Sequence, residues 1–265
     1  MSDTISAEMK ENTARSGVFD DYDPSVKIRT KKMLMYLIIF AVVMIFAGLT
    51  SAYIVINAGK YWVHVSPPTL LTVSTLVIAL SSLTFYLALK LTKQGNKGGG
   101  LAMIVLTFAL GLTFTITQYR GWQQLAEKGM GFTIREENGV KISSWNRISG
   151  IKGEYGADYY VYKDGERLIL ENGEYFAPDD QLRANPLTYD VEKTSNLSSS
   201  FIAVLLGLHV LHLAFGLMYL IVLAVRSARG IINSGNTISL YTGGIYWHFL
   251  GILWIYLFLF LFFIH

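Results

Sequence analysis

The sequence predicts an all-α integral membrane protein, a bundle of five transmembrane helices with a small β-rich extramembrane insert between helices 3 and 4. Three observations predict this class. The chain is 52% hydrophobic and only 15% charged, which is rare in a water-soluble globule. Five uncharged runs are long enough to cross about 30 Å of hydrocarbon at 1.5 Å per residue. One long polar stretch separates the third run from the fourth.

The five uncharged runs are expected to be helices, because in lipid each backbone polar group must be bonded within its own segment. They cover Met33–Asn57, Val65–Leu89, Gly98–Tyr119, Leu197–Val225 and Ile238 to the end of the chain. The expected domains are then a polar N-terminal segment over 1–30, helices 1 to 3 over 31–120, the insert over 121–196 and helices 4 and 5 over 197–265. The first run starts too late for an ordinary secretory signal.

Basic residues predict the orientation of these helices. They gather beside the N-terminus and two connections, as Lys27, Arg29, Lys31, Lys32, Lys90, Lys93, Lys97, Arg226 and Arg229, against Lys60 alone in the short loop opposite. Cytoplasmic loops are enriched in Lys and Arg. We therefore expect a cytoplasmic N-terminus, with the insert and the C-terminal His265 on the outer side. Trp62, Tyr119 and Trp122 suit the outer aromatic belt.

The stretch from Gly121 to Asn196 is charged and rich in Tyr and Gly, unlike the rest of the chain. Three dipeptides favour hairpin turns, and short segments between them have strand propensity. The dipeptides are Asn138-Gly139, Asp164-Gly165 and Asn172-Gly173, and the segments include Val140–Ser144, Tyr159–Tyr162 and Arg167–Leu170. These features predict the β-rich insert.

Composition also excludes several kinds of site. The chain has no cysteine, which excludes disulfides, iron–sulfur clusters, thiolate metal sites and thiol nucleophiles. Its net charge of +3 is small and the basic residues are scattered, so no nucleic-acid-binding surface is indicated. None of the five runs contains an acidic residue, which argues against a proton relay within the chain.

Histidines in the fourth and fifth runs are the candidates for chemistry. His209 and His212 form one helical stripe with Gly216, so both rings and the glycine are expected to face the same neighbouring helix. The imidazoles could ligate haem or a metal. The alternative, which we favour, is that each ring hydrogen-bonds a neighbouring helix, either directly or through water. His248 is the only other histidine well inside a run, and no acidic residue completes a ligand set.

Small residues and tryptophans in the same helices indicate close packing. Gly244, His248 and Gly251 form a stripe on the fifth run, and Trp247 and Trp254 overlap it. Small residues let helix backbones approach closely. Those with this expected role are Ala47, Gly48, Ala52, Ser74, Ser81, Ser82, Gly207 and Gly216.

Two of these segments resemble a known family. The segment from Gly207 to His212, with Gly216, resembles the Gly-x-His-x-x-His-x-x-x-Gly signature of the penultimate helix of subunit III of haem-copper cytochrome oxidases. Tyr246 to Trp254 resembles the Trp-His-Phe-x-Asp-x-x-Trp signature of its last helix. Weaker matches are Met44 to Tyr53, Pro67 to Ser74 and Gln118 to Trp122.

The resemblance implies the short, five-helix form of subunit III, in a bacterial cytoplasmic membrane. Such a subunit has no catalytic, cofactor-binding or metal-binding residue. It stabilises the catalytic subunit I and its lipid surroundings during electron transfer to O2 and proton pumping in aerobic respiration. Haem and copper belong to partner subunits, and structural phospholipids are expected. The implied partners are subunit I directly, subunit II and other respiratory-complex chains, with no nucleic acid.

The residues that match the family motifs are expected to act in helix packing. They are Gly48, Tyr53, Gln118, Gly207, His209, His212, Gly216, Trp247, His248, Phe249 and Trp254. Three acidic positions of the family differ here. Its membrane-embedded glutamate falls on Val42, the aspartate of the last motif on Gly251, and the glutamate after Gln118 on Gly121.

Three other functions stay open at this point. Subunit III of a quinol oxidase shares these helices, and the electron donor is recognised by another subunit. A stand-alone haem-binding membrane protein would use His209, His212 or His248. A transporter is the third, although the chain has no internal repeat and no broken helix. The insert has no assigned role beyond a hypothetical contact with an electron-donor domain or a neighbouring complex.

Overall fold

A computed structural model describes residues 24–57, 61–65, 69–130, 132–137, 140–145, 148, 151–194 and 197–263. It is mostly helical, and five helices of this described part are long and apolar enough to cross a membrane. They are α2 (Pro24–Asn57), α3 (Thr69–Lys93), α4 (Lys97–Glu127), α6 (Leu197–Ala228) and α7 (Ile238–Phe263). The multi-pass membrane class predicted from the sequence is therefore supported. His265 and most of the polar N-terminal segment lie outside the described residues.

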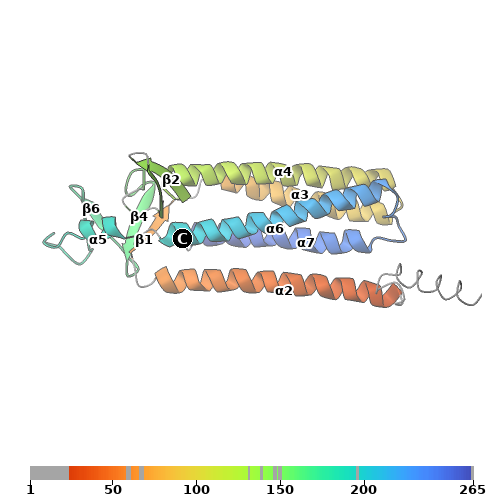
Figure 1. The fold of residues 1–265 in the computed structure, drawn as a ribbon, viewed down its shortest axis with the longest axis horizontal. Coiled ribbons are helices and arrows are strands. Elements are labelled where there is room, and N and C mark those ends of the chain that lie inside the picture. The colour runs from red at the N-terminus through yellow and green to blue at the C-terminus, as the bar shows by residue number, and fades with distance from the viewer. Residues whose placement is uncertain are drawn as a thin grey trace, which may run out of the picture. The chain divides into compact units, whose positions relative to one another are not determined.

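The chain divides into two compact units, one up to Val42 and the other from Val43 onward, so that α2 contributes to both. Within the second unit, α3, α4, α6 and α7 run side by side (Figure 1). Each packs on two others, in the cyclic order α3, α4, α6, α7. All contacts discussed below lie within this second unit.

A tight turn joins α3 to α4, as the short polar segment predicts. Asn96 caps α4, since its side-chain oxygen accepts a hydrogen bond from the backbone N–H of Gly99 at 2.9 Å, a common N-cap interaction. Gly95 has a φ of +83°, which glycine adopts without steric cost. The basic residues Lys90, Lys93 and Lys97 therefore gather at the end of the bundle away from the strands (Figure 1).

The first strand was not predicted. β1 (Tyr61–Val65) pairs antiparallel with β4 (Tyr159–Lys163), which pairs with β5 (Glu166–Arg167). The expected span Val65–Leu89 is therefore wrong at its start, because Val65 ends a strand and the helix begins at Thr69. The pairing of β1 with β4 places the α2–α3 connection and the insert at the same end of the bundle, as five alternating spans require.

Two further hairpins and a short helix complete the insert. They are β2 (Phe132–Glu137) with β3 (Val140–Trp145), β6 (Ile169–Glu171) with β7 (Glu174–Phe176), and α5 (Thr188–Lys193). The turns at Asp164-Gly165 and Asn172-Gly173 are confirmed, since all four residues have positive φ, as type I′ turns need. Asn138-Gly139 lies outside the described residues. The expected strand Arg167–Leu170 is interrupted at Leu168, which separates β5 from β6.

The helix α4 extends beyond the expected span Gly98–Tyr119 and ends at Glu127, so the start of the expected insert is helical. Packing explains this extension, because Leu125 and Met130 are buried with residues of the insert in one hydrophobic cluster. Lys128 adds an ion pair to Asp158, with 3.1 Å between Nζ and Oδ1. The end of α4 thus anchors the insert.

Candidate functional site

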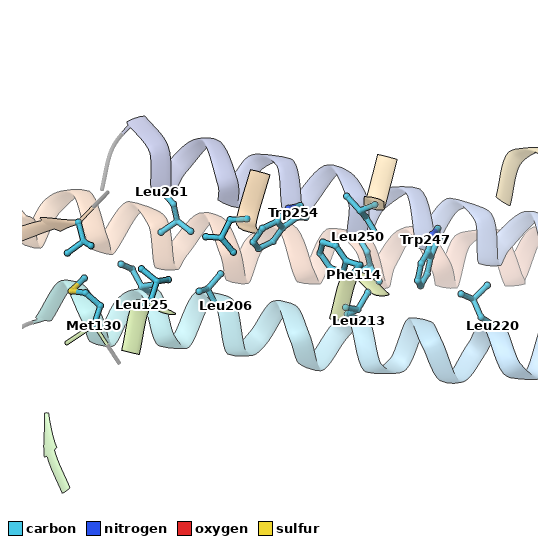
Figure 2. Packing of buried hydrophobic residues seen from close by; sticks show 14 of the residues in the cluster. Phe114, Leu125, Met130, Leu206, Leu213, Leu220, Trp247, Leu250, Trp254 and Leu261 are labelled. Carbon is cyan, nitrogen blue, oxygen red and sulfur yellow. The ribbon is translucent and has the colours of Figure 1, made fainter. Parts of the chain in front are cut away.

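Trp247 lies at the centre of the four packed helices. It extends from α7 toward α6, as do Leu250 and Trp254 (Figure 2). Its ring is 1% exposed and lies over glycines of two other helices. A Cβ added at Gly111 would be 2.8 Å from Trp247 Cη2, and one at Gly216 would be 3.4 Å from Trp247 Cε3. The two glycines thus make room for the indole between α4, α6 and α7.

Hydrogen bonds to hydroxyl groups of α3 fix the two tryptophans. Trp247 Nε1 donates to Ser81 Oγ and Trp254 Nε1 donates to Thr75 Oγ1, each at 3.0 Å. Gln118 of α4 reaches the same helix, because its Nε2 donates to Ser74 Oγ at 2.6 Å. Three motif residues therefore bind α3 through buried polar contacts.

His209 of α6 is 1% exposed. Its ring meets the rings of Phe114 and Trp254, at centroid distances of 6.2 and 5.5 Å. Among the described residues, neither ring nitrogen has a hydrogen-bond partner. His209 therefore makes no direct hydrogen bond to a neighbouring helix within the described residues, and a hydrogen bond through water stays a prediction.

His212 does not share the surroundings of His209. It is half-buried, and its ring contacts Phe46 of α2 at a centroid distance of 6.0 Å. Its Nδ1 donates to the Leu208 carbonyl of its own helix at 2.6 Å. The expectation that His209, His212 and Gly216 face one neighbour is wrong, because residues three apart on a helix differ by about 60° in direction, and α6 has neighbours on several sides.

The stripe on α7 does face a single helix. Added Cβ atoms at Gly244 and Gly251 would lie 3.1 Å from Phe85 Cε1 and 3.3 Å from Ser82 Oγ, both on α3. The ring of His248 also meets Phe85, at 6.0 Å between centroids. His248 is half-buried, and so is Phe249, which packs against the core.

The other motif residues lie apart from this group. Tyr53 is fully buried near the end of α2, where its hydroxyl accepts a hydrogen bond from Trp62 Nε1 at 2.9 Å. Among the described residues, a Cβ added at Gly48 or Gly207 would meet no atom within 4 Å. A packing role for these two glycines stays a prediction that concerns a partner chain or lipid.

Two further features bear on chemistry. In the described parts of the chain, no group of three or more His, Cys, Asp or Glu residues could hold a metal ion. A cavity of about 100 Å³ lies between α4 and α6, bordered by Gln118, Tyr119 and His209 among others. Sequence reasoning did not find this cavity, because residues from α4, α6 and α7 meet there and no local pattern records their meeting.

His64 gives a testable pH dependence outside the helices. In β1 it lies opposite Tyr160 of β4, its ring is 6.3 Å from that of Tyr162, and burial lowers its pKa below the usual 6.5. Below about pH 6.5 the unfolded chain therefore binds more protons than the folded chain, so the stability of the fold decreases as the pH is lowered. The contribution of neutral His64 to stability is fully present above about pH 6.5, and it is lost as the pH falls through the lowered pKa of the folded state.

We expect the backbone amides of β1 and β4 to exchange hydrogen faster at pH 5.5 than at pH 7.5, after correction for intrinsic exchange rates. His64→Phe should remove this difference. Asp158 does not interfere, because hydrogen bonds from the Glu154 N–H and from Lys128 lower its pKa below 3.8. Equal pH dependence in wild type and His64→Phe would contradict the prediction.

Comparison with known proteins gives partial matches. No protein-family model matches the chain. Over 65 residues it is 42% identical to cytochrome c oxidase subunit 3 of Alkalihalophilus pseudofirmus and 35% identical to that of Bacillus subtilis, which is 24% of this chain and 31% of each relative. Over 60 residues it is 38% identical to a probable quinol oxidase subunit 3 of Staphylococcus saprophyticus, 23% of this chain and 29% of that protein. The matched stretches thus span less than a third of these relatives.

Proposed function

We propose that this chain is subunit III of a haem-copper oxidase, a non-catalytic subunit that stabilises the catalytic subunit I. One observation carries the proposal. Most residues of the histidine- and tryptophan-bearing motifs lie in helix contacts, although Gly207 does not, and Trp247 and Trp254 are bonded to hydroxyl groups of α3. The similarity to bacterial oxidase subunits 3 supports the same conclusion.

The outer surfaces of these helices are suited to contact with a neighbouring chain. Large apolar side chains are exposed on every long helix, for example Leu76, Val105, Met218 and Ile252, each more than half exposed. In a bilayer such surfaces meet lipid or the helices of other chains. We propose that they hold structural phospholipids and contact subunit I, with subunit II as a further partner.

In this proposal the haem and copper centres belong to the partner subunits, and this chain binds none. The rings of His209, His212 and His248 each pack against an aromatic residue of a different helix, which fits a role in helix packing. The chain's own work is then to keep subunit I and its lipids in place while electrons pass to O2 and protons are pumped.

The basic residues at the ends of α3 and α6 support an orientation with the N-terminus in the cytoplasm of a bacterium and the insert outside its inner membrane. The electron donor is a separate question, because the relatives include subunits 3 of both cytochrome c and quinol oxidases. We propose cytochrome c as the donor and a quinol as the second candidate. The purified complex should oxidise reduced cytochrome c, and oxidation of quinol alone would select the second candidate.

The main test is removal of this chain from the native membrane. We expect oxidase without it to keep most of its initial rate but to lose activity several-fold faster during turnover, because its role is structural. The measurement is O2 consumption over time by purified enzyme with and without the chain, with the wild-type chain restored as control. Unchanged inactivation, or a tagged chain that purifies alone with a haem Soret band, would overturn the proposal.

A further inference from the structure

A buried imidazole without a partner borders a cavity between α4 and α6. The cavity has a volume of about 100 Å³, and its walls include Thr115, Gln118 and Tyr119 of α4, His209 and Val210 of α6, and Trp254 of α7. Neither nitrogen of His209 is hydrogen-bonded within the described chain. A buried polar group left without a hydrogen bond destabilises the folded chain, so an occupant of the cavity that bonds to the ring would be favoured.

We propose that this cavity is a hydration site, in which water molecules hydrogen-bond to His209. The proposal does not depend on the oxidase assignment. A neutral imidazole offers one donor and one acceptor, and water can serve either. Both nitrogens are covered by protein atoms in the described position of the ring, so the proposal requires the ring to turn about its Cβ–Cγ bond until a nitrogen meets the water. That torsion has broad energy wells in histidine, which makes the rotation inexpensive compared with an unsatisfied nitrogen.

The size of the cavity favours water over a ring-shaped ligand. Each water takes about 30 Å³ in the liquid, whereas a cavity that holds benzene measures about 150 Å³. The volume of about 100 Å³ therefore fits about three waters and is smaller than the cavity that holds benzene. A lipid acyl chain could enter but would leave the imidazole without a partner.

Other polar groups in the wall can bond to the same water. The Thr115 hydroxyl donates to the Gly111 carbonyl at 2.9 Å, which leaves its oxygen free to accept. Gln118 uses Nε2 for Ser74 and keeps a carbonyl oxygen as a further acceptor. An internal water typically makes 2–4 hydrogen bonds, and the side chains of Thr115, Gln118 and His209 supply groups of both kinds.

Water can reach the cavity from the end of the bundle that carries the insert. Tyr119 is 62% exposed and lies eight residues before the end of α4 at Glu127, which is about 12 Å along the helix. Tyrosine and tryptophan are enriched where a membrane meets water, and Tyr119 borders the cavity beside Trp122. The path from the aqueous side is therefore short.

Solid-state NMR of the full chain in lipid bilayers, with 15N-labelled histidine, tests this proposal. His209→Gln identifies the His209 signals, and magnetisation is transferred to them selectively from water or from lipid acyl protons. We expect transfer from water in the wild type and its loss in Val210→Phe, where the larger ring fills the cavity. Val204→Phe is the matched control, because Val204 is on the same helix but 44% exposed, and it should keep the transfer.

Each other outcome overturns the proposal. Transfer from acyl protons would show a lipid chain in the cavity, and no transfer from either source would show a dry one. Water transfer that persists in folded Val210→Phe would place the water elsewhere. Should Val210→Phe not fold, Thr115→Leu fills the same cavity from α4 and must abolish the transfer in its place.

Discussion

Trp247→Ala is expected to lower the free energy of unfolding of the full chain by about 3 kcal/mol, the lower end of the usual range for a buried tryptophan replaced by alanine. The indole is 1% exposed, donates a hydrogen bond to Ser81 and fills the space above Gly111 and Gly216. Its loss leaves a cavity where α4, α6 and α7 meet. The lower end applies because unfolded membrane helices remain in lipid, which weakens the hydrophobic term.

The measurement is SDS-induced unfolding of the chain in mixed micelles, followed by circular dichroism. Trp247→Phe separates packing from hydrogen bonding, since it keeps a ring but loses the N–H, and should cost about 1 kcal/mol. Ile252→Ala is the control on the same helix, because Ile252 is 65% exposed and its loss should change stability by less than about 0.5 kcal/mol. A Trp247→Ala chain as stable as Ile252→Ala would contradict the packing described here.

The sequence predicts the five helices well, because each apolar run is long and uncharged, and it predicts their ends less well. Tyr61–Val65 is apolar and adjoins the next helix, so hydropathy alone merges part of the strand with that helix. Its aromatic and β-branched residues were a usable strand signal. The end of α4 was placed too early because Arg120 and Glu127 resemble loop residues, whereas packing of Leu125 against the insert maintains the helix.

In the candidate site, spacing along one helix predicts which residues share a face, but it does not predict partners that lie far away in the sequence. Helical periodicity alone places Gly244, His248 and Gly251 on one face of α7, and they do meet α3. The periodicity does not reveal how many helices surround a segment. It therefore predicts one neighbouring helix for both His209 and His212. The partners of Trp247 and Trp254 are hydroxyl groups more than 160 residues away, and no spacing within α7 predicts them.

Gly216→Leu is expected to destabilise the chain by about 3 kcal/mol, the upper part of the usual cost of overpacking. A Cβ at Gly216 alone would lie 2.9 Å from Leu250 Cδ1 and 3.4 Å from the Trp247 ring, and leucine adds three more carbon atoms. Trp247 cannot move aside easily, since Ser81 holds its N–H and Gly111 lies against its other edge. The helices α6 and α7 must therefore separate to admit the leucine.

Gly207→Leu is the matched control, because it makes the same substitution in the same helix. It gains the same helix propensity, about 1 kcal/mol, but a Cβ there meets no described atom within 4 Å, so the isolated chain should be at least as stable as the wild type in SDS unfolding. If the two variants are equally stable, the close approach of α6 to α7 is wrong. If Gly207→Leu is stable alone but no longer purifies with oxidase subunits, Gly207 lies where a partner helix packs, which is the role that its place in the histidine motif predicts.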